Sequence, residues 1–176
     1  MNTTDTVLRS VMDQAIETCT HHVNAGGLPF VGVVVNKAGQ MLSRFGVNRV
    51  AETGDPMAHA EVVAMREAMA THGLDTLTGT VLLATGEPCG LCYRYAINHG
   101  IEAIYVAADR DEAAAYGFDY LASYPAFGVT DTRRDALLQP LPVARAIEPF
   151  TRYLTLHPSG RASPQPDTPP KGTPLS

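Results

Sequence analysis

The feature that most constrains the fold is a strand, a helix and a second strand that follow one another directly. Residues 80–85 and 101–107 are apolar runs of strand length, and residues 89–99 between them have helical spacing and end at Gly100. Two neighbouring strands that point the same way need a crossover, most often a helix, so this pattern predicts a βαβ unit with buried strands. We therefore expect a sheet that is at least partly parallel.

The first part of the chain predicts a helix, a hairpin and a second helix. Residues 7–23 carry apolar side chains at helical spacing. Residues 30–35 and 40–47 flank a short turn and predict two antiparallel strands. After a polar loop, a further helix opens at residues 55–61 and ends near Gly73.

The signals downstream are weaker but complete the sheet. Residues 111–115 and 118–124 predict short helical pieces, residues 142–147 predict a last strand, and residues 148–156 predict a terminal helix. Together with the elements above, this gives five strands with helices on both sides. We therefore predict an α/β fold, a three-layer α/β/α sandwich around one mixed five-stranded sheet.

Composition separates one folded domain from a tail. From Pro158 to the end of the 176 residues, six prolines alternate with Ser, Gly and Thr, which predicts a disordered segment. The whole chain is 45% apolar and has no internal repeat, so the part before the tail can bury one core. We therefore predict a single domain over residues 1–157 and a Pro-rich tail over residues 158–176.

The charge balance limits the partners. Lys and Arg total 13 against 18 Asp and Glu, a formal charge of -5, and only Lys37 and Lys171 are lysines. Binding to a phosphate backbone normally needs a clustered basic face, so nucleic acid is a disfavoured partner. The sequence shows no signal peptide and no long apolar span, which predicts a cytoplasmic protein that does not enter a membrane.

The spacing of the cysteines points to a metal site. Three cysteines are an odd number and give no disulfide framework, and Cys19 falls on the apolar stripe of the first helix, where it is expected in the core. Cys89 and Cys92 stand three residues apart at a helix start, so their sulfurs share one face, and the helix N-terminus favours their thiolate forms. Together with His59 they form a known ligand set for a hydrolytic Zn²⁺ site that keeps one open position for water.

Glu61, two residues after His59, is a candidate catalytic residue rather than a ligand. On a regular helix the two side chains point about 200° apart, so only an irregular helix start brings both to one pocket. In that arrangement Glu61 carries the proton of the activated water. A lone Glu in a first helical turn would usually just stabilise the helix dipole, and Glu87, just before Cys89, is expected only to cap its helix.

These residues match a known signature. The pattern H-x-E followed by P-C-x-x-C is typical of zinc nucleobase deaminases and is matched in type, order and spacing by His59, Glu61, Pro88, Cys89 and Cys92. With the stretches DPMAHAEVVAMREA and GEPCGLCYRYAI, the chain resembles the zinc-dependent cytidine and deoxycytidylate deaminase-like family over residues 5–156, and within it most resembles the bacterial guanine deaminases. The resemblance implies a cytidine-deaminase-like fold, bound Zn²⁺ and hydrolytic release of ammonia from a small amino-heterocycle.

The resemblance also implies substrate contacts and a dimer. Asn48 in GVNRV would hydrogen-bond the substrate ring, Phe30 in LPFVGVVV would pack on its face, and the backbone around Ala60 would contact its edge. On general grounds Phe30 could equally be a core aromatic and Asn48 a turn residue. The family further implies a homodimer in which the segment 148–156 is exchanged to close the partner's pocket.

One position departs from the guanine deaminases. The segment DRDEAAAYGFDY is similar to theirs, but where they usually carry an acidic residue after GFD, thought to recognise guanine and transfer a second proton, this chain has Tyr120. A phenol with a pKa of about 10 cannot replace a carboxylate as a base near neutral pH. Either Asp119 takes this place by a shift of one residue, or the substrate is another ring of the pterin, triazine or cytosine type.

Several alternatives stay open. The same zinc motif occurs in tRNA adenosine deaminases, although the charge of -5 argues against them, and a nucleoside substrate also fits. An inactive zinc-stabilised binding domain would have the ligands but would not need Glu61. Taken alone, the C-x-x-C pair fits a redox pair or half of a structural zinc site.

Overall fold

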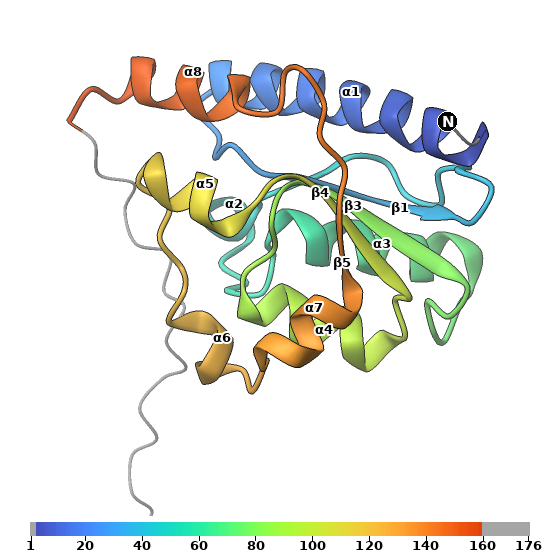
Figure 1. Cartoon of the computed structure of the whole chain (residues 1–176). Coiled ribbons are helices and arrows are strands. Elements are labelled where there is room, and N and C mark those ends of the chain that lie inside the picture. The colour runs from blue at the N-terminus through green and yellow to red at the C-terminus, as the bar shows by residue number, and fades with distance from the viewer. Residues whose placement is uncertain (1–2, 160–176) are drawn as a thin grey trace, which may run out of the picture.

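The computed structural model describes residues 3–159 and shows one mixed sheet between two layers of helices (Figure 1). The strand order is β2-β1-β3-β4-β5, in which β1 pairs antiparallel with β2 and β3 while β3, β4 and β5 run parallel. The bounds are Val31–Asn36 for β1, Gly46–Val47 for β2, Thr80–Gly86 for β3, Ala103–Ala108 for β4 and Leu138–Pro140 for β5. The predicted α/β sandwich is confirmed. The tail predicted at 158–176 lies outside the described residues from residue 160 on, so the division at residue 157 stays a prediction.

The βαβ unit forms as predicted. β3 is followed by helix α4 (Gly90–His99), which ends at Gly100 and leads into β4, and Gly86 lies opposite Ala108 in the parallel register. Every residue of β3 is buried, because helices cover this central strand on both faces. The first turn of α4 therefore starts close to the carboxyl end of a buried strand.

Two helical layers enclose the sheet (Figure 1). Helices α1 (Thr3–Asn24) and α8 (Glu148–Leu156) lie side by side over one face, and α3 (Ala60–His72) and α4 lie over the other. Each face has its own apolar core, one including Met12, Ile16, Val33 and Leu83, the other including Val62, Met65, Leu82 and Tyr93. These cores fix the helices relative to the strands.

Helix α1 is the longest helix of residues 3–159, and like the other described helices it is not long and apolar enough to cross a membrane. Its Cys19 is fully buried, and Thr85 Oγ1 donates a hydrogen bond to the sulfur at 3.8 Å. Burial raises the pKa of Cys19 to about 12, so the thiol stays protonated. Its predicted place in the core is confirmed.

Helix α8 packs against α1 of its own chain. Phe150 is fully buried in an aromatic cluster, and Arg152 Nε donates to Asn24 Oδ1 at 2.6 Å. The predicted exchange of this segment between two chains is not tested by one chain and stays a prediction.

Strand β2 is much shorter than the strand predicted for residues 40–47. Only Gly46–Val47 pairs as a regular strand with β1. Upstream, Ser43 Oγ accepts the Val34 N–H at 3.0 Å, so a side chain takes the place that a backbone carbonyl of a continuous strand would fill. The antiparallel hairpin is confirmed, whereas its predicted length is wrong.

The predicted last strand at residues 142–147 is also wrong. This stretch forms turns, in which Ala146 N–H donates to the Val143 carbonyl, and the fifth strand is Leu138–Pro140 instead. Pro140 fits there because β5 is an edge strand, where a missing N–H leaves no ladder partner unpaired.

The connecting segments carry short helices. Helix α5 confirms the predicted piece at 111–115, whereas α6 lies at the end of the predicted piece at 118–124, and α2 and α7 are not among the predicted elements. Their bounds are Val50–Thr53 for α2, Arg110–Ala115 for α5, Ser123–Ala126 for α6 and Asp131–Leu137 for α7. Thr130 caps α7 by accepting the Arg133 N–H at 3.2 Å, a local signal that the sequence does contain.

We expect Ile16→Ala to destabilise the domain. Ile16 is fully buried between α1 and the sheet, so the substitution removes apolar contacts and leaves a cavity that should lower the free energy of unfolding by about 2–5 kcal/mol. Urea denaturation followed by circular dichroism measures the change. Glu17→Ala, on the exposed side of the same helix, is the control and should change stability by less than about 0.5 kcal/mol. Equal effects of the two variants would contradict the packing described.

Candidate active site

The residues that open α3 and α4 have extended rather than helical backbones. His59 precedes the first helical residue of α3 with φ -66° and ψ 155°, and Cys89 does the same for α4 with φ -71° and ψ 174°. His59 and Glu61 therefore do not share one regular helix. The angle of about 200° between their side chains, which a regular helix would impose, does not apply. The helix start is irregular in the way that a shared pocket for these two side chains requires.

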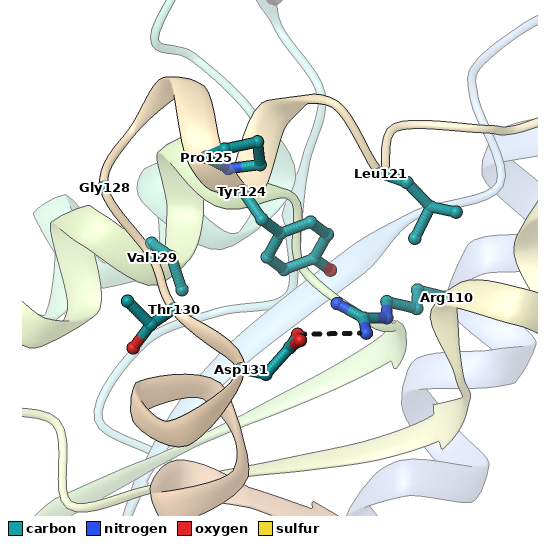
Figure 2. Close-up of a pocket in the computed structure, with 8 residues that line it drawn as sticks. All are labelled: Arg110, Leu121, Tyr124, Pro125, Gly128, Val129, Thr130 and Asp131. Atoms are coloured by element: carbon teal, nitrogen blue, oxygen red, sulfur yellow. Dashed lines mark hydrogen bonds and ion pairs between the residues drawn. The ribbon is translucent and has the colours of Figure 1, made fainter.

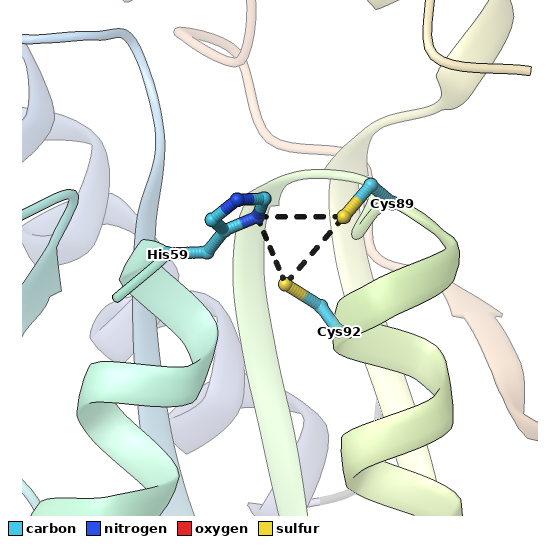
Figure 3. A group of neighbouring side chains, drawn as sticks. All are labelled: His59, Cys89 and Cys92. Atoms are coloured by element: carbon cyan, nitrogen blue, oxygen red, sulfur yellow. Dashed lines mark hydrogen bonds between the residues drawn. The ribbon is translucent and has the colours of Figure 1, made fainter. Parts of the chain in front are cut away.

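Figure 3 shows the His59 ring and two sulfur atoms facing one another. His59 Nδ1 lies 3.4 Å from Cys89 Sγ and 3.6 Å from Cys92 Sγ, the sulfurs are 3.7 Å apart, and all three side chains are buried. A tetrahedral zinc ion, with bonds of about 2.3 Å to sulfur and about 2.0 Å to nitrogen, requires such ligand atoms to lie about 3.5–3.8 Å apart. The residues therefore fit Zn²⁺ with a fourth position left over, and the predicted cofactor is confirmed.

Glu61 lies beside the ligand set. Its Oε2 accepts a hydrogen bond from Cys92 Sγ at 3.4 Å, and the carboxyl group is buried. Burial, followed by the charge of Cys89, raises the pKa of Glu61 to about 7. A carboxyl group with a pKa near neutrality can both accept and release a proton. The catalytic role of Glu61 stays a prediction, but its side chain is within reach of the ligands.

The two thiols of the ligand set differ in acidity. The hydrogen bond shared with Cys92, together with His59, lowers the pKa of Cys89 well below its usual value, whereas burial raises the pKa of Cys92. The pair therefore carries one negative charge readily, and a divalent cation held by both sulfurs would displace the second proton.

Two glycines let the ligand-bearing helices approach neighbouring backbone. A Cβ at Gly90 would lie 2.3 Å from the Ser123 carbonyl oxygen, and a Cβ at Gly32 would lie 2.8 Å from the Glu61 Cα. Backbone cannot move aside as a flexible side chain can, so larger residues would push these helices away. The Gly90 N–H also donates to Ser123 Oγ at 2.8 Å, which joins α4 to α6.

Hydroxyl groups from a later segment hold the turn before α4. Tyr120 Oη donates to the Glu87 carbonyl at 2.5 Å, and Tyr124 Oη donates to the Pro88 carbonyl at 2.7 Å. The turn that leads to the two cysteines thus has its carbonyl groups satisfied by side chains more than thirty residues away. These contacts were not predicted, because nothing in the local pattern indicates them.

The expectation that Glu87 only caps α4 is wrong. Cys89 occupies the capping position, and the Glu87 carboxylate pairs with Arg134 of α7. The sequence indicates a cationic partner only by placing the acidic Glu87 directly after a buried strand, because a buried charge needs a counter-charge. The sequence does not say which arginine supplies it.

An aromatic cluster adjoins Tyr120, which packs against the core that contains the two cysteines of the ligand set. Phe30 and Tyr120, both predicted to bind substrate, have ring centroids 6.2 Å apart, and Phe30 also contacts Phe118 and Phe150 at 5.3 and 5.5 Å. Burial, with smaller contributions from nearby charges that include Glu61, raises the pKa of Tyr120 well above its usual value. Tyr120 is therefore a neutral phenol near Glu61.

The remaining predicted substrate contacts differ in placement. Asn48 is half-buried after β2, and its Oδ1 accepts the Val50 N–H at 3.1 Å, which leaves the amide NH₂ as the donor for a ligand. Ala60 is buried in the first turn of α3, where N–H groups have no acceptor within the helix. Asp119, by contrast, is exposed, and its Oδ1 accepts the Leu121 N–H at 3.1 Å, so the structure does not bring it to the ligand set.

A surface cavity of about 610 Å³ lies along the α6–α7 segment (Figure 2). Arg110 forms an ion pair there with Asp131 at 3.3 Å, and its guanidinium carbon lies 4.9 Å from the centroid of the Tyr124 ring. None of the residues predicted to bind metal or substrate lines this cavity. This cavity is therefore separate from the residues predicted to bind metal and substrate.

Known proteins share this ligand-bearing region. Residues 5–108 match the family model described as the cytidine and deoxycytidylate deaminase zinc-binding region. A guanine deaminase of Bacillus subtilis is 37% identical over 109 residues, which are 61% of this chain and 69% of that protein. A tRNA-specific adenosine deaminase of Aquifex aeolicus is 36% identical over 81 residues, which are 46% of this chain and 53% of that protein.

Further likenesses concern the fold and the shared segment. The solved guanine deaminase of Nitrosomonas europaea superposes with a TM-score of 0.68 at 24% identity, covering 84% of each chain, which shows a common fold. A tRNA(Ile)-lysidine synthase of Deinococcus radiodurans is 34% identical over 110 residues, 62% of this chain but only 19% of that protein. The chain thus spans about a fifth of this longer relative.

We expect the purified protein to contain about one zinc ion per chain. Cys92→Ala should lose most of it, because only two protein ligands remain. Metal analysis by mass spectrometry after dialysis measures the zinc content. Cys19→Ala removes the thiol that lies outside the site and should keep the full zinc content. Zinc retained by Cys92→Ala, or lost from Cys19→Ala, would contradict the assigned ligands.

Proposed function

The chain belongs to the family of zinc-binding cytidine and deoxycytidylate deaminases, and we propose that it is a hydrolytic deaminase of a free nucleobase or related amino-heterocycle, of the guanine type. The observation that carries this proposal is the Glu61 carboxyl group 3.4 Å from a sulfur of a buried His-Cys-Cys set. A zinc site that only stabilises a fold normally has four protein ligands and needs no adjacent proton carrier. The three ligands and Glu61 therefore favour an enzyme over an inactive zinc-stabilised domain.

The reaction adds water to the ring carbon that carries the exocyclic amine, breaks the C–N bond and releases ammonia, while the ring carbon becomes a carbonyl. Zinc held by His59, Cys89 and Cys92 would supply a water molecule that is acidic enough to act near neutral pH. Glu61 takes a proton from the attacking water and delivers it to a ring nitrogen, and then takes the proton of the hydroxyl group added to the ring carbon and delivers it to the leaving amine. Because Glu61 is buried, it exchanges these protons with the reacting atoms rather than with bulk water.

The side chains beside the ligand set suit a flat ring. Phe30 packs on one face of the substrate, and the ring of Tyr120 forms the adjoining wall, as their 6.2 Å separation supports. The Asn48 NH₂ group donates to a ring acceptor, and the N–H of Ala60 in the first turn of α3 contacts the ring edge.

The wall formed by Tyr120 bears on the choice of substrate. The guanine deaminases that the chain resembles usually have an acidic residue here, whereas the Tyr120 hydroxyl is occupied by the Glu87 carbonyl and Asp119 is exposed. Neither residue supplies a second carboxylate beside Glu61. We therefore expect a broad or non-guanine preference that includes rings of the pterin, triazine or cytosine type.

A tRNA adenosine or nucleoside deaminase is the second candidate. The similarity to the Aquifex aeolicus tRNA-specific adenosine deaminase favours it. The formal charge of -5 and the presence of only two lysines argue against docking of a polynucleotide. The small heterocycle and water are therefore the partners that we propose, without nucleic acid.

The assembly and location follow the resemblance. We expect a homodimer, in which exchange of the segment Glu148–Leu156 would let the partner's α8 make the contacts that α8 makes with α1 in one chain. A cytoplasmic location agrees with three free cysteines. The catalytic domain would be residues 1–157.

The reaction is tested by measuring ammonia release from guanine, isoguanine, cytosine, pterin, ammeline, adenosine, cytidine and an adenosine-containing tRNA. We expect turnover of at least one free base or pterin-type or triazine-type ring and none of the tRNA. Glu61→Gln should keep its zinc but lose at least about 100-fold in kcat, because the proton carrier is gone. No turnover of any free ring, or full turnover by Glu61→Gln, would sink the proposal.

Asn48→Asp tests the proposed substrate contact. Aspartate retains an oxygen for the Val50 N–H but replaces the donating NH₂ with an acceptor. We expect kcat/KM for the best substrate to fall about 10- to 100-fold, because a buried ring acceptor of the substrate loses its hydrogen-bond donor. The melting temperature should stay close to that of the wild type. Steady-state kinetics and thermal unfolding measure the two effects. Unchanged kinetics would remove Asn48 from the site.

A further inference from the structure

We propose that the buried ion pair between Glu87 and Arg134 positions the turn that carries Cys89 and Cys92, so that α7 holds the two sulfurs at metal-binding distance. This inference rests on the metal site of the proposed function. Glu87 follows β3 directly and precedes Cys89 by two residues. It acts as a positioning residue through the backbone of the turn and is not itself a ligand.

The Glu87 carboxylate is completely enclosed by donors. Its Oε1 accepts from Tyr93 Oη at 3.2 Å and from Arg134 Nε, and its Oε2 accepts from Arg134 Nη2 at 2.9 Å and from the backbone N–H of Arg110 at 2.9 Å. The Glu87 side chain is 0% exposed and that of Arg134 is 14% exposed. A guanidinium fork on both oxygens, with two further donors, leaves the carboxylate one orientation.

The backbone of Glu87 is fixed as well. Its N–H donates to the Ala108 carbonyl of β4 at 2.8 Å, and its carbonyl accepts from Tyr120. Through side chain and backbone, Glu87 thus joins β4, α4, the start of α5 and the later helix α7. Cys89 is the first side chain of the ligand set along the chain from this anchor, so a rotation of Glu87 would displace it first.

The metal site has little tolerance for such a displacement. Metal–ligand distances in proteins vary by only about 0.2 Å, and Cys89 Sγ stands 3.7 Å from Cys92 Sγ and 3.4 Å from His59 Nδ1. Fold stability alone does not call for an ion pair here, because apolar residues of similar volume are often as stabilising as a buried pair. The pair between Glu87 and Arg134 therefore serves the orientation of the turn.

Three variants of the full chain separate orientation from stability. Glu87→Gln places an NH₂ group against the donors of Arg134 or Arg110, and Arg134→Lys keeps the charge but loses the two-point contact. The double variant Glu87→Gln/Arg134→Met removes both charges. Zinc affinity is measured by competition with a chromophoric chelator, sulfur geometry by the absorption of the Co²⁺-loaded protein, and stability by thermal unfolding without metal.

We expect each single variant to bind zinc at least about tenfold more weakly and to shift the cobalt–thiolate absorption. The double variant should recover thermal stability relative to Glu87→Gln, because no buried charge is left unpaired, while its zinc affinity stays low. Wild-type zinc affinity in all three variants overturns the inference. A double variant that recovers zinc affinity together with thermal stability overturns it as well.

Ile16→Ala is the matched control for loss of stability, since Ile16 lies in the core on the other face of the sheet. It should change zinc affinity by less than about twofold. If Ile16→Ala lost as much zinc affinity as Glu87→Gln, the pair of Glu87 and Arg134 would only stabilise the fold and would not position the turn. A wild-type protein without zinc affinity would overturn the metal site and the proposed function too, whereas unaffected variants of a zinc-binding protein overturn only the positioning role.

Discussion

The starts of two helices meet beside the carboxyl end of β3, and the distance between them decides whether a metal ion can bind. One helix brings His59, while the other brings Cys89 and Cys92, so no single element contains the ligand set. The sheet sets this distance, because Gly32 of β1 lies opposite Ala84 of β3 and admits the backbone of α3 without a Cβ in between. Antiparallel pairing of β1 with β3 is thus a condition for the site, although neither strand supplies a ligand.

Two buried carboxyl groups flank the cysteine turn in opposite environments. Glu87 has donors on both oxygens and a guanidinium partner, so its charge is neutralised and its position is fixed. Glu61 instead lies beside the ligand set, where its Oε2 accepts a hydrogen bond from Cys92 Sγ. Burial raises the pKa of Glu61 to about 7, which suits a group that must gain and lose a proton. The same residue type therefore suits anchorage on one side of the turn and proton transfer on the other.

The parts of the site that could be predicted are those with local signals. His59, Cys89 and Cys92 stand at helix starts that the sequence predicts, one within the segment 55–61 and the other at residue 89, one residue before α4 begins. The βαβ pattern also predicts which strand the second helix follows. The errors arise where tertiary partners decide. The Ser43 side chain interrupts a run that alternates like a strand, and the pairing of Glu87 with Arg134 joins residues whose separation along the chain leaves no pattern. The short β5 is set by its register with β4 rather than by its own composition.

In the proposed function, the aromatic cluster would restrict the substrate further. Phe30 contacts the rings of Phe118 and Phe150 edge to face, at interplanar angles of 84° and 87°. These contacts limit the rotation of the Phe30 ring, so it cannot easily turn aside for a bulky ligand. Tyr120 adjoins it as a neutral phenol whose hydroxyl is already bound. A rigid apolar wall offers shape and stacking but no counter-charge, and the net charge of -5 does not attract a polyanion. Recognition by shape, with the Asn48 amide and the Ala60 N–H as the proposed donors, would therefore suit a small, flat and uncharged ring.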